Sequence, residues 1–451
     1  MMAMRLSEAA EVLEARRSGA DVRFAGLSTD TRTLAADNLF FALAGPRFDG
    51  HDYVERARAA GAAAAAVSRG IDTALPLLQV EDTRLALGRL AAHWRGRFAF
   101  PVIGVTGSNG KTTVKEMLAA ILGTAGPVLA TRGNLNNDIG VPLTLACLAP
   151  EHIGAVIEMG ANHPGEIAYL TALARPTVGI VTNAGPAHLE GFGSIAGVAR
   201  AKGELFAGLA DDAVAVINAD DAYADLWRGL AGNRRVLSFG LTVDADVSGN
   251  YRSVDGHTRL QLRTPTGETE LDLPMPGRHN VLNALGAAAA ALAAGADLAA
   301  VRRGLESLAP VAGRLQRKRR SDGGIVLDDT YNANPGSLTA AIDVLREAPA
   351  PRWLVLGDMG ELGPDAAALH AEAGTYAQAA GIDALYCLGE LAAQAARSFG
   401  PGARAFMDFD ELLAALRADL NAEVTLLVKG SRRMGMERVV RALAETEGGR
   451  A

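Results

Sequence analysis

The sequence predicts an α/β protein of three domains: a small α/β N-terminal domain, a central parallel-sheet domain and a C-terminal Rossmann-like domain. The chain has 451 residues, which is more than one hydrophobic core ordinarily organises. In two stretches, short apolar runs rich in β-branched residues alternate with segments of helical length, which is typical of a parallel sheet covered on both faces. Before them, short apolar segments such as "NLFFALAG" lie between turn-forming residues. We therefore expect domains at about 1–98, 99–310 and 311–451.

Composition narrows the functional class. Apolar residues make up 49% and charged residues 21% of the chain, an ordinary globular balance. The net charge is −7 and the basic residues are spread out, which argues against nucleic acid as a partner. The only cysteines, Cys147 and Cys387, cannot form a disulfide framework, and no Cys/His spacing indicates zinc.

The first residues predict an amphipathic helix rather than a signal peptide. Glu8, Glu11 and Glu14 interrupt the apolar stretch that a signal peptide needs, while apolar residues at 6, 9, 10 and 13 follow helical spacing. The weakly polar runs at 59–67 and 286–294 are short and mostly alanine, so no transmembrane segment is expected. These patterns predict a cytoplasmic protein without membrane contact.

Four apolar runs predict the parallel strands of the central domain: "PVIGVTG", "GAVIEMG", "VGIVTN" and "AVAVIN". The stretch 236–273 alternates apolar and polar residues and predicts a small antiparallel insertion. An alanine-rich helix is expected to begin near Asn280.

The third block begins after residues 309–324, a polar, glycine-containing and basic stretch that predicts a solvated hinge. Its strands are expected at "GIVLDDTY", "RWLVLGDM", "ALYCLG" and "TLLVKGS".

The motif "GVTGSNGKTT" at 104–113 predicts a phosphate-binding loop. It follows a predicted strand and precedes the helical segment "KTTVKEMLAAIL". Glycines let backbone N–H groups close around phosphates, and the helix N-terminus adds a favourable dipole. Lys111 would reach the β- and γ-phosphates and Thr112 would ligate magnesium. The loop departs from the general motif, since Val105 stands where that motif has glycine. The alternative is a simple glycine-rich turn.

The segment "TGSNGKTT" resembles the nucleotide loop of the Mur ligase family, the ATP-dependent amino-acid ligases of peptidoglycan assembly. Further segments match this family in order and extend the resemblance over nearly the whole chain. They are "STDTRTLAADNLFFALAGPRFDGHDYVERA", "GNLNNDIGVPLTL", "IEMGANHPGEI", "TNAGPAHLEGFGS", "AKGELF", "GRHNVLNALGAAA", "DDTYNANPGS", "LGDMGELG" and "LVKGSRRMGME". Within the family, the first-domain segment is similar to the branch that adds D-alanyl-D-alanine.

The resemblance implies an activity and its ligands. ATP and Mg²⁺ would be used to join D-alanyl-D-alanine to UDP-N-acetylmuramoyl-tripeptide through an acyl phosphate. The N-terminal domain would bind the UDP substrate, the central domain ATP, and the C-terminal domain would complete the ligase site. A monomer is expected.

The resemblance also implies the catalytic and metal-binding residues. Lys111 would contact the transferred phosphate. Glu158 ends an apolar strand-like run, where α/β proteins place ligands, and would bind magnesium with Thr112. His188 and Lys202, the latter as a carbamate, would hold a second magnesium. From the residues alone, His188 reads as structural and Lys202 as a solvated lysine near a helix start.

Two larger sets are implied for nucleotide and substrate. ATP would be bound by Thr106, Gly107, Ser108, Asn109, Gly110, Lys111, Thr112, Thr113, Asn280, Asn283, Arg314, Asp329, Tyr331 and Asn332. The UDP group of the substrate would be bound in the first domain by Ser28, Thr31, Arg32, Asp49, Gly50 and His51. The peptide substrates would be bound by Asn134, Asn136, Asn137, Asn334, Lys429 and Ser431. For Asn280 the alternative is helix capping, and for the asparagines at 134–137 it is a turn.

Two other functions stay open at this point. One is another ATP-dependent ligase of the superfamily. However, the chain lacks the D-N-P-R signature of the tripeptide-forming relative, and "DGHD" and "YNANP" are not features of folylpolyglutamate synthetases. The other is a nucleotide-binding regulator without turnover. The third residue of the tripeptide, lysine or meso-diaminopimelate, is also open.

Overall fold

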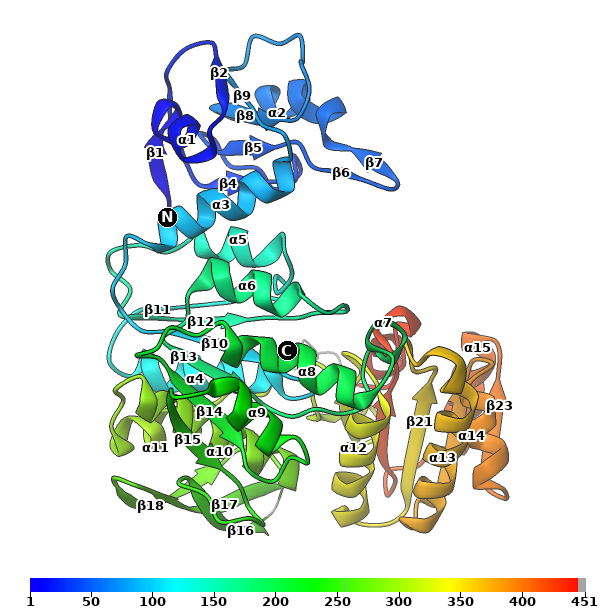
Figure 1. Cartoon of the computed structure of the whole chain (residues 1–451). Coiled ribbons are helices and arrows are strands. Elements are labelled where there is room, and N and C mark those ends of the chain that lie inside the picture. Colours follow the sequence, from blue (N-terminus) through cyan, green and yellow to red (C-terminus); the bar gives the residue numbers. More distant parts are fainter. Residues whose placement is uncertain (255, 445–451) are drawn as a thin grey trace, which may run out of the picture.

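A computed structural model of the chain describes residues 1–254 and 256–444. It contains three α/β parts, each with its own sheet (Figure 1), which confirms the predicted fold class. In Figure 1 the N-terminal part stacks above the central part, and the C-terminal part lies beside the lower half of the central part. The domain boundaries at 98 and 310 stay a prediction.

The N-terminal part has a five-stranded sheet of order β2-β9-β8-β5-β4. The predicted amphipathic helix is α1, with Leu6, Ala9 and Leu13 buried. Elements of this part are β1 (Ala3–Arg5), α1 (Leu6–Leu13), β2 (Arg16–Ser18), β3 (Arg23–Ala25), β4 (Leu27–Ser28), β5 (Leu39–Phe41), β6 (Ala44–Gly45), β7 (Phe48–Asp49), η1 (Gly50–Tyr53), α2 (Val54–Ala59), β8 (Ala64–Val67), β9 (Leu77–Gln79) and α3 (Thr83–Arg95).

Helix α3 joins this part firmly to the central part. The Trp94 indole donates a hydrogen bond to the Leu148 carbonyl at 3.0 Å, and the buried Arg95 guanidinium donates to the Ala174 carbonyl at 2.9 Å. Met2, just before β1, also contacts the central part, since its amide donates to the Ala146 carbonyl. The two parts therefore share buried contacts through α3 and the first residues of the chain.

The central part is built on an all-parallel sheet of order β11-β12-β10-β13-β14-β15. Apolar clusters cover both faces, as the near-continuous apolar strands predict. Its elements are β10 (Val102–Thr106), α4 (Lys111–Gly123), β11 (Val128–Ala130), α5 (Gly140–Leu145), β12 (Gly154–Glu158), α6 (Glu166–Ala174), β13 (Val178–Val181), α7 (Leu189–Phe192), α8 (Ile195–Ala207), β14 (Val214–Asn218), α9 (Ala224–Ala231), β15 (Arg235–Phe239), β16 (Ser248–Val254), β17 (His257–Thr264), β18 (Gly267–Leu273), α10 (Arg278–Ala293) and α11 (Leu298–Glu306).

One boundary in this part was predicted wrongly. Strands β16, β17 and β18 form the expected antiparallel sheet, but residues 235–239 are the sixth strand of the parallel sheet. This strand begins with an exposed arginine because it lies at the sheet edge. The sequence of this strand, RVLSF, mixes polar with apolar residues as the antiparallel strands after it do, so the pattern alone does not separate it from them.

The C-terminal part has a six-stranded sheet of order β19-β20-β24-β21-β22-β23, antiparallel only at β19. Its elements are β19 (Gln316–Arg319), β20 (Ile325–Asp329), α12 (Pro335–Glu347), β21 (Arg352–Gly357), η2 (Gly363–Asp365), α13 (Ala366–Ala379), β22 (Ala384–Leu388), α14 (Ala392–Phe399), β23 (Ala403–Phe406), α15 (Phe409–Asp419), β24 (Thr425–Lys429), η3 (Arg432–Met434) and α16 (Glu437–Leu443). All four predicted strands of this block are present.

The predicted solvated hinge at 309–324 is only partly a connection. Residues 316–319 form β19, and Arg320 is 1% exposed, with its guanidinium donating to the carbonyl oxygens of Asn421 and Val424. The run of basic residues had indicated a solvent-exposed connection. Instead, residues 316–319 form an edge strand whose alternate side chains face outward, and the buried Arg320 donates to backbone carbonyl oxygens.

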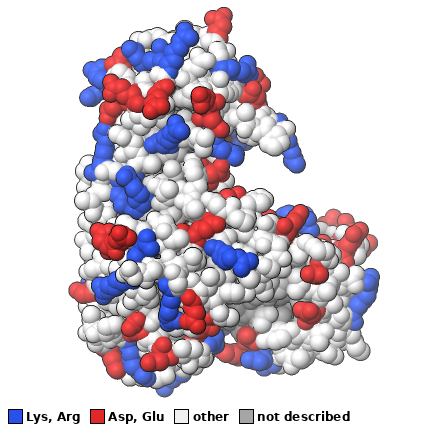
Figure 2. All heavy atoms as spheres, viewed as in Figure 1, with Lys and Arg blue, Asp and Glu red and all other residues white. Residues whose placement is uncertain are grey.

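The surface in Figure 2 carries both signs of charge interspersed, and a notch separates the N-terminal and C-terminal parts on this face. No helix in the described ranges is long and apolar enough to cross a membrane.

Candidate active site

A cavity of about 970 Å³ opens where the central and C-terminal parts meet. Its walls come from the loop after β10, the carboxyl ends of β12, β13 and β14, the start of α10, the residues just before β19 and the loop after β20. The start of α3 also reaches it through Arg84 and Leu85. Parallel strands place their carboxyl ends at one edge of a sheet, and crevices at that edge bind ligands in open α/β proteins.

The phosphate-binding loop has the predicted strand–loop–helix context. Strand β10 ends at Thr106 and α4 begins at Lys111. Gly107 and Gly110 have φ of 142° and 82°, and a Cβ at these positions would lie 2.0 Å from Thr182 Oγ1 and 2.3 Å from Asn283 Oδ1. Side chains are therefore excluded at both glycines.

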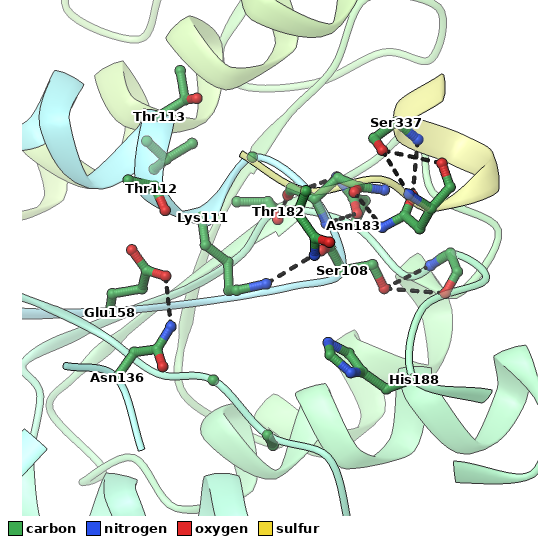
Figure 3. A pocket seen from close by; sticks show the side chains of 18 of the residues that line it. Ser108, Lys111, Thr112, Thr113, Asn136, Glu158, Thr182, Asn183, His188 and Ser337 are labelled. Atoms are coloured by element: carbon green, nitrogen blue, oxygen red, sulfur yellow. Dashed lines mark hydrogen bonds between the residues drawn. The ribbon is translucent and has the colours of Figure 1, made fainter. Parts of the chain in front are cut away.

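Lys111 lies in the cavity with its Nζ donating to the Gly107 carbonyl at 2.7 Å and the Ser108 carbonyl at 3.2 Å (Figure 3). Removal from water and the charge of Arg314 lower the pKa of Lys111, while the Glu158 carboxylate opposes that shift. Thr106 and Gly107 of the predicted ATP set do not line the cavity. The buried Thr106 hydroxyl instead donates to the Met159 carbonyl.

Glu158 ends β12 and is 2% exposed, which rules out a carboxylate facing solvent. Asn136 Nδ2 donates to its Oε1 at 2.9 Å (Figure 3), and its Oε2 is buried without a hydrogen-bond partner among the described residues. An unpartnered buried carboxylate oxygen is costly unless a ligand satisfies it. A hard divalent cation fits this oxygen.

The Thr112 hydroxyl faces the same region and accepts a hydrogen bond from Arg314 Nη2 at 2.9 Å. Within 1–254 and 256–444, no three His, Cys, Asp or Glu side chains are grouped to hold a metal ion. A Mg²⁺ ion here would therefore draw its other ligands from substrate phosphates and water, as Mg²⁺ commonly does.

Lys202 is not the solvated lysine that its sequence context suggests. It lies in the second half of α8, is 1% exposed, and donates to the Ala161 carbonyl at 3.3 Å. Its Nζ lies 5.2 Å from the centre of the Phe192 ring. Burial, and then the charge of Lys111, lower the pKa of Lys202 to about 7. Lys202 lies behind the cavity wall, to which Ala161 belongs.

His188 lines the cavity and its ring points toward the phosphate-binding loop (Figure 3). It has a φ of 54° and precedes the short helix α7. Its Nδ1 lies 2.5 Å from Oε2 of Glu361, a residue of the C-terminal part. The carboxylate lies off the direction of a hydrogen bond from Nδ1. Burial and the charges of Lys111 and Lys202 lower the pKa of His188, against the effect of Glu361.

Asn280 and Asn283 lie on one face of α10, as their spacing predicts, and both line the cavity. The capping interpretation of Asn280 is wrong because Gly277 is the N-cap residue. The Asn280 amide instead donates to the Pro276 carbonyl at 2.8 Å. Phe239 and Met275 line the same end, so polar amides lie beside apolar surface, a combination suited to a base.

The C-terminal part contributes Arg314, Asp329, Tyr331, Asn332 and Lys429 to the cavity. The Arg314 guanidinium lies 4.4 Å from the Tyr331 ring centre. Lys429 Nζ is already paired with the Asp329 carboxylate and donates to the Asn332 carbonyl at 3.0 Å. Lys429 could therefore meet a substrate carboxylate only by sharing or leaving these partners.

Asn334 ties the two parts together. It caps α12, and its Nδ2 donates to Asn109 Oδ1 of the phosphate-binding loop at 2.8 Å. Ser431 is buried but does not line the cavity. Among the predicted peptide-binding asparagines, Asn136 and Asn137 line the cavity and Asn134 does not. Asn137 Oδ1 accepts from the Gly140 amide at 2.9 Å, so the turn interpretation fits this residue.

The residues predicted to bind the UDP group are not brought into this cavity. Arg32 is exposed and paired with Asp30 at 2.6 Å. Asp49 Oδ1 lies 2.5 Å from Nδ1 of the buried His51, and hydrogen bonds from His51 lower the pKa of Asp49 to about 2. A Cβ on Gly50 would lie 2.6 Å from the Leu43 backbone. Ser28 and Thr31 also lie in the N-terminal part, outside the cavity wall. The UDP site stays a prediction.

Several residues that line the cavity were not predicted from the sequence. Asn183 follows β13 and Asn218 ends β14, so the rule that ligands bind at the carboxyl ends of parallel strands could have found them. His279 precedes Asn280 in "GRHN", and burial lowers its pKa to about 4. Nothing in the sequence around Phe239 and Met275 indicates a binding site, because only the fold places them beside α10.

Three family models match the chain. The Mur ligase family catalytic domain matches residues 23–95, the Mur ligase middle domain residues 105–291, and the Mur ligase glutamate ligase domain residues 313–432.

Relatives of known name and structure align over nearly the full chain. The UDP-N-acetylmuramoyl-tripeptide–D-alanyl-D-alanine ligase of Escherichia coli K12 is 47% identical over 449 residues, covering 99% of each chain. The ligase of the same name from Bacillus subtilis 168 is 35% identical over 93% of each chain. The crystal structure of MurF from Acinetobacter baumannii superposes with a TM-score of 0.93 at 36% identity, covering 98% of each chain. The MurF ligase of Thermotoga maritima in complex with ADP gives 0.81 at 28% identity, covering 93% of this chain and 96% of the other. The chain belongs to the Mur ligase family.

Proposed function

We propose that this Mur ligase joins D-alanyl-D-alanine to UDP-N-acetylmuramoyl-tripeptide and converts ATP to ADP and phosphate in the same reaction. The observation that carries the proposal is one cavity that combines a phosphate-binding loop, a buried unpartnered carboxylate and loops of the C-terminal part. The names of the full-length relatives support the choice of substrates.

The reaction needs an activated carboxylate. A carboxylate oxygen of the tripeptide attacks the γ-phosphorus of ATP, the bond to the β-phosphate oxygen breaks, and ADP leaves. The amine of D-alanyl-D-alanine then attacks the acyl carbon. The tetrahedral intermediate loses inorganic phosphate and a proton, and an amide remains.

Positioning and charge neutralisation dominate such phosphoryl transfer. Lys111, at the N-terminus of α4, would release its contacts to Gly107 and Ser108 and turn to the β- and γ-phosphates. Arg314 would approach the phosphates from the C-terminal part, next to Thr112. Asn280 and Asn283 would bind the adenine edge.

Magnesium would be held by Thr112 and Glu158, with His188 and a carbamate of Lys202 at a second position. The bound ions would neutralise charge on the transferring phosphoryl group. A pKa of about 7 favours the carbamate, because only the neutral amine of Lys202 adds CO2.

The acyl phosphate would be hydrolysed by water, so the site has to close. Asn334 and Arg314 already contact the phosphate-binding loop and α4 from the C-terminal part. Docking of this part would exclude water from the intermediate. We place the enzyme in the cytoplasm as a monomer that makes the pentapeptide precursor of the cell wall. Through it the enzyme would serve cell shape and division.

The test is phosphate release from ATP and Mg²⁺ with UDP-N-acetylmuramoyl-tripeptide, with and without D-alanyl-D-alanine, using lysine and meso-diaminopimelate forms of the tripeptide. Release that needs both substrates, with the pentapeptide seen by mass spectrometry, supports the proposal. Release with a different amine would retain the ligase chemistry and refute the substrate. No release with any pair would refute the proposal.

A further inference from the structure

The segment "LGDMGELG" has no part in the proposed chemistry, yet its Glu361 reaches into the candidate site. Glu361 follows β21 in the C-terminal part, and its carboxylate oxygen Oε2 lies 2.5 Å from Nδ1 of His188 in the central part. The His188 side chain is 27% exposed and that of Glu361 is 60% exposed. This contact joins the C-terminal part to a residue that is proposed to bind metal.

The backbone at both residues adopts a conformation that ordinary side chains avoid. Glu361 has a φ of 61° and His188 a φ of 54°. Non-glycine residues are uncommon in this region, and they cluster at functional sites. The two left-handed residues face each other across the junction of the two parts.

The loop that carries Glu361 is held rigidly at its base. The Met359 amide donates to Nε2 of the fully buried His370 at 2.9 Å, and the Asp358 carboxylate accepts from the Ala392 amide at 2.8 Å. The Asp358 carbonyl accepts from the Ser431 amide. Because these bonds fix residues 358 and 359, the position of Glu361 follows from the docking of the C-terminal part.

The charges around His188 indicate what the Glu361 carboxylate does there. Lys111 and Lys202 face His188 from the central part, and Glu361 is the acid that acts on it from the other side. An imidazole that binds a metal ordinarily donates its second N–H to a carboxylate or carbonyl, which fixes the tautomer and the ring orientation. Glu361 Oε2 is within reach of Nδ1, and this nitrogen has no other hydrogen-bond partner among the described residues.

We propose that Glu361 is a positioning residue, which holds Nδ1 of His188 and so presents Nε2 to a divalent cation when the C-terminal part is docked. This inference rests on the proposed function for the role of His188. It couples metal binding in the central part to the arrival of a residue from the C-terminal part.

The test compares Glu361→Gln and Glu361→Ala with Glu190→Gln. Glu190 is an exposed acid of α7 that lies against the same loop at Gly363, and it serves as the matched control. Mn²⁺ is titrated by electron paramagnetic resonance into the full chain with a non-hydrolysable ATP analogue. In parallel, kcat and KM are measured against Mg²⁺, ATP, tripeptide and dipeptide.

If two Mn²⁺ ions bind, the ion at His188 should be the one affected by the Glu361 variants. Its affinity should fall by about 10-fold to 100-fold in these variants. They should raise the Mg²⁺ concentration for half-maximal rate while leaving KM for the tripeptide unchanged. Glu190→Gln should match the parent, and His188→Ala combined with Glu361→Gln should be no worse than His188→Ala alone.

Unchanged Mn²⁺ binding in both Glu361 variants would overturn the proposal. If in addition KM rose for the dipeptide alone, Glu361 would be a binding residue for the incoming amine. The Mn²⁺ titration needs no turnover, so its outcome is separate from whether the parent enzyme makes the pentapeptide.

Discussion

At the scale of single residues, Lys202 shows how burial prepares a side chain for chemistry. Its amine is almost fully removed from water and has a pKa of about 7, so it is half neutral near physiological pH. Below pH 7 the protonated form dominates in the folded state. As pH rises through 7, the neutral form increases and can add CO2. The unfavourable effect of Lys202 on folding is complete below pH 7 and decreases as pH rises toward the pKa of the unfolded chain.

We therefore predict that incubation with ¹³C-bicarbonate produces a carbamate signal in the ¹³C NMR spectrum of the folded enzyme. Its intensity should be low at pH 6 and several-fold higher at pH 8. Lys202→Met should lack the signal and most of the activity. A signal that persists in Lys202→Met, or that does not change with pH, would contradict the assignment.

Lys111 supports a second prediction at this scale. Replacement by Met removes the positive charge next to the phosphate position while keeping the length of the side chain. Loss of one preorganised electrostatic contact typically lowers kcat by about 100-fold to 1,000-fold. Steady-state kinetics should show this decrease with an unchanged thermal unfolding transition. A kcat within about threefold of the parent would exclude Lys111 from phosphoryl transfer.

Local patterns in the sequence predicted where several site residues lie on their helices and strands. They did not predict which distant residues these side chains contact. The spacing of Asn280 and Asn283 correctly predicted a shared helix face, and the apolar approach to Glu158 correctly predicted a buried strand end. The pairing of Lys429 with Asp329 joins residues 100 positions apart. Such a contact depends on how β20 and β24 pair, which local pattern does not encode.

At the scale of elements, β19 shows again that local sequence pattern does not predict long-range contacts. Its basic run indicated a solvated connection, yet it forms the edge of a sheet and leads into a buried arginine. Arg320 donates to the Val424 carbonyl at 2.8 Å and pairs with Asp322. Strands, helices and the antiparallel insertion were predictable from periodicity, whereas an arginine buried by acceptors from a distant loop was not.

Arg320→Ala should destabilise the C-terminal part by about 3 kcal/mol, because it leaves buried carbonyl oxygens and a carboxylate without their donor. The neighbouring Arg319→Ala is the matched control, since Arg319 is exposed on the same strand and should change stability by less than about 0.5 kcal/mol. Denaturant unfolding followed by fluorescence would compare the transition midpoints. Equal midpoints for the two variants would refute the role of Arg320.

At the scale of the whole molecule, the candidate site belongs to no single part. Arg314 reaches Thr112 and Asn334 reaches Asn109, contacts that join residues more than 200 positions apart in the chain. Ligands that bind on both sides of this junction should therefore hold the parts together.

Small-angle X-ray scattering should show a smaller radius of gyration when a non-hydrolysable ATP analogue and both peptide substrates are present than without ligands. The ATP analogue alone should give a smaller change, because it leaves the N-terminal part without a ligand. An unchanged radius of gyration with all ligands bound would contradict closure.

The strand order of the C-terminal sheet has a consequence for how the protein is made. Strand β24 lies between β20 and β21, although both of these precede it by many residues. During translation β20 and β21 emerge first, and each must keep an apolar edge unpaired until residues 425–429 are synthesised. A nascent or prematurely terminated chain that lacks residues 425–429 would expose two unpaired, aggregation-prone strand edges. Ribosome stalling within the preceding stretch should therefore recruit chaperones or produce aggregates, and synonymous codons there would affect yield without changing any residue.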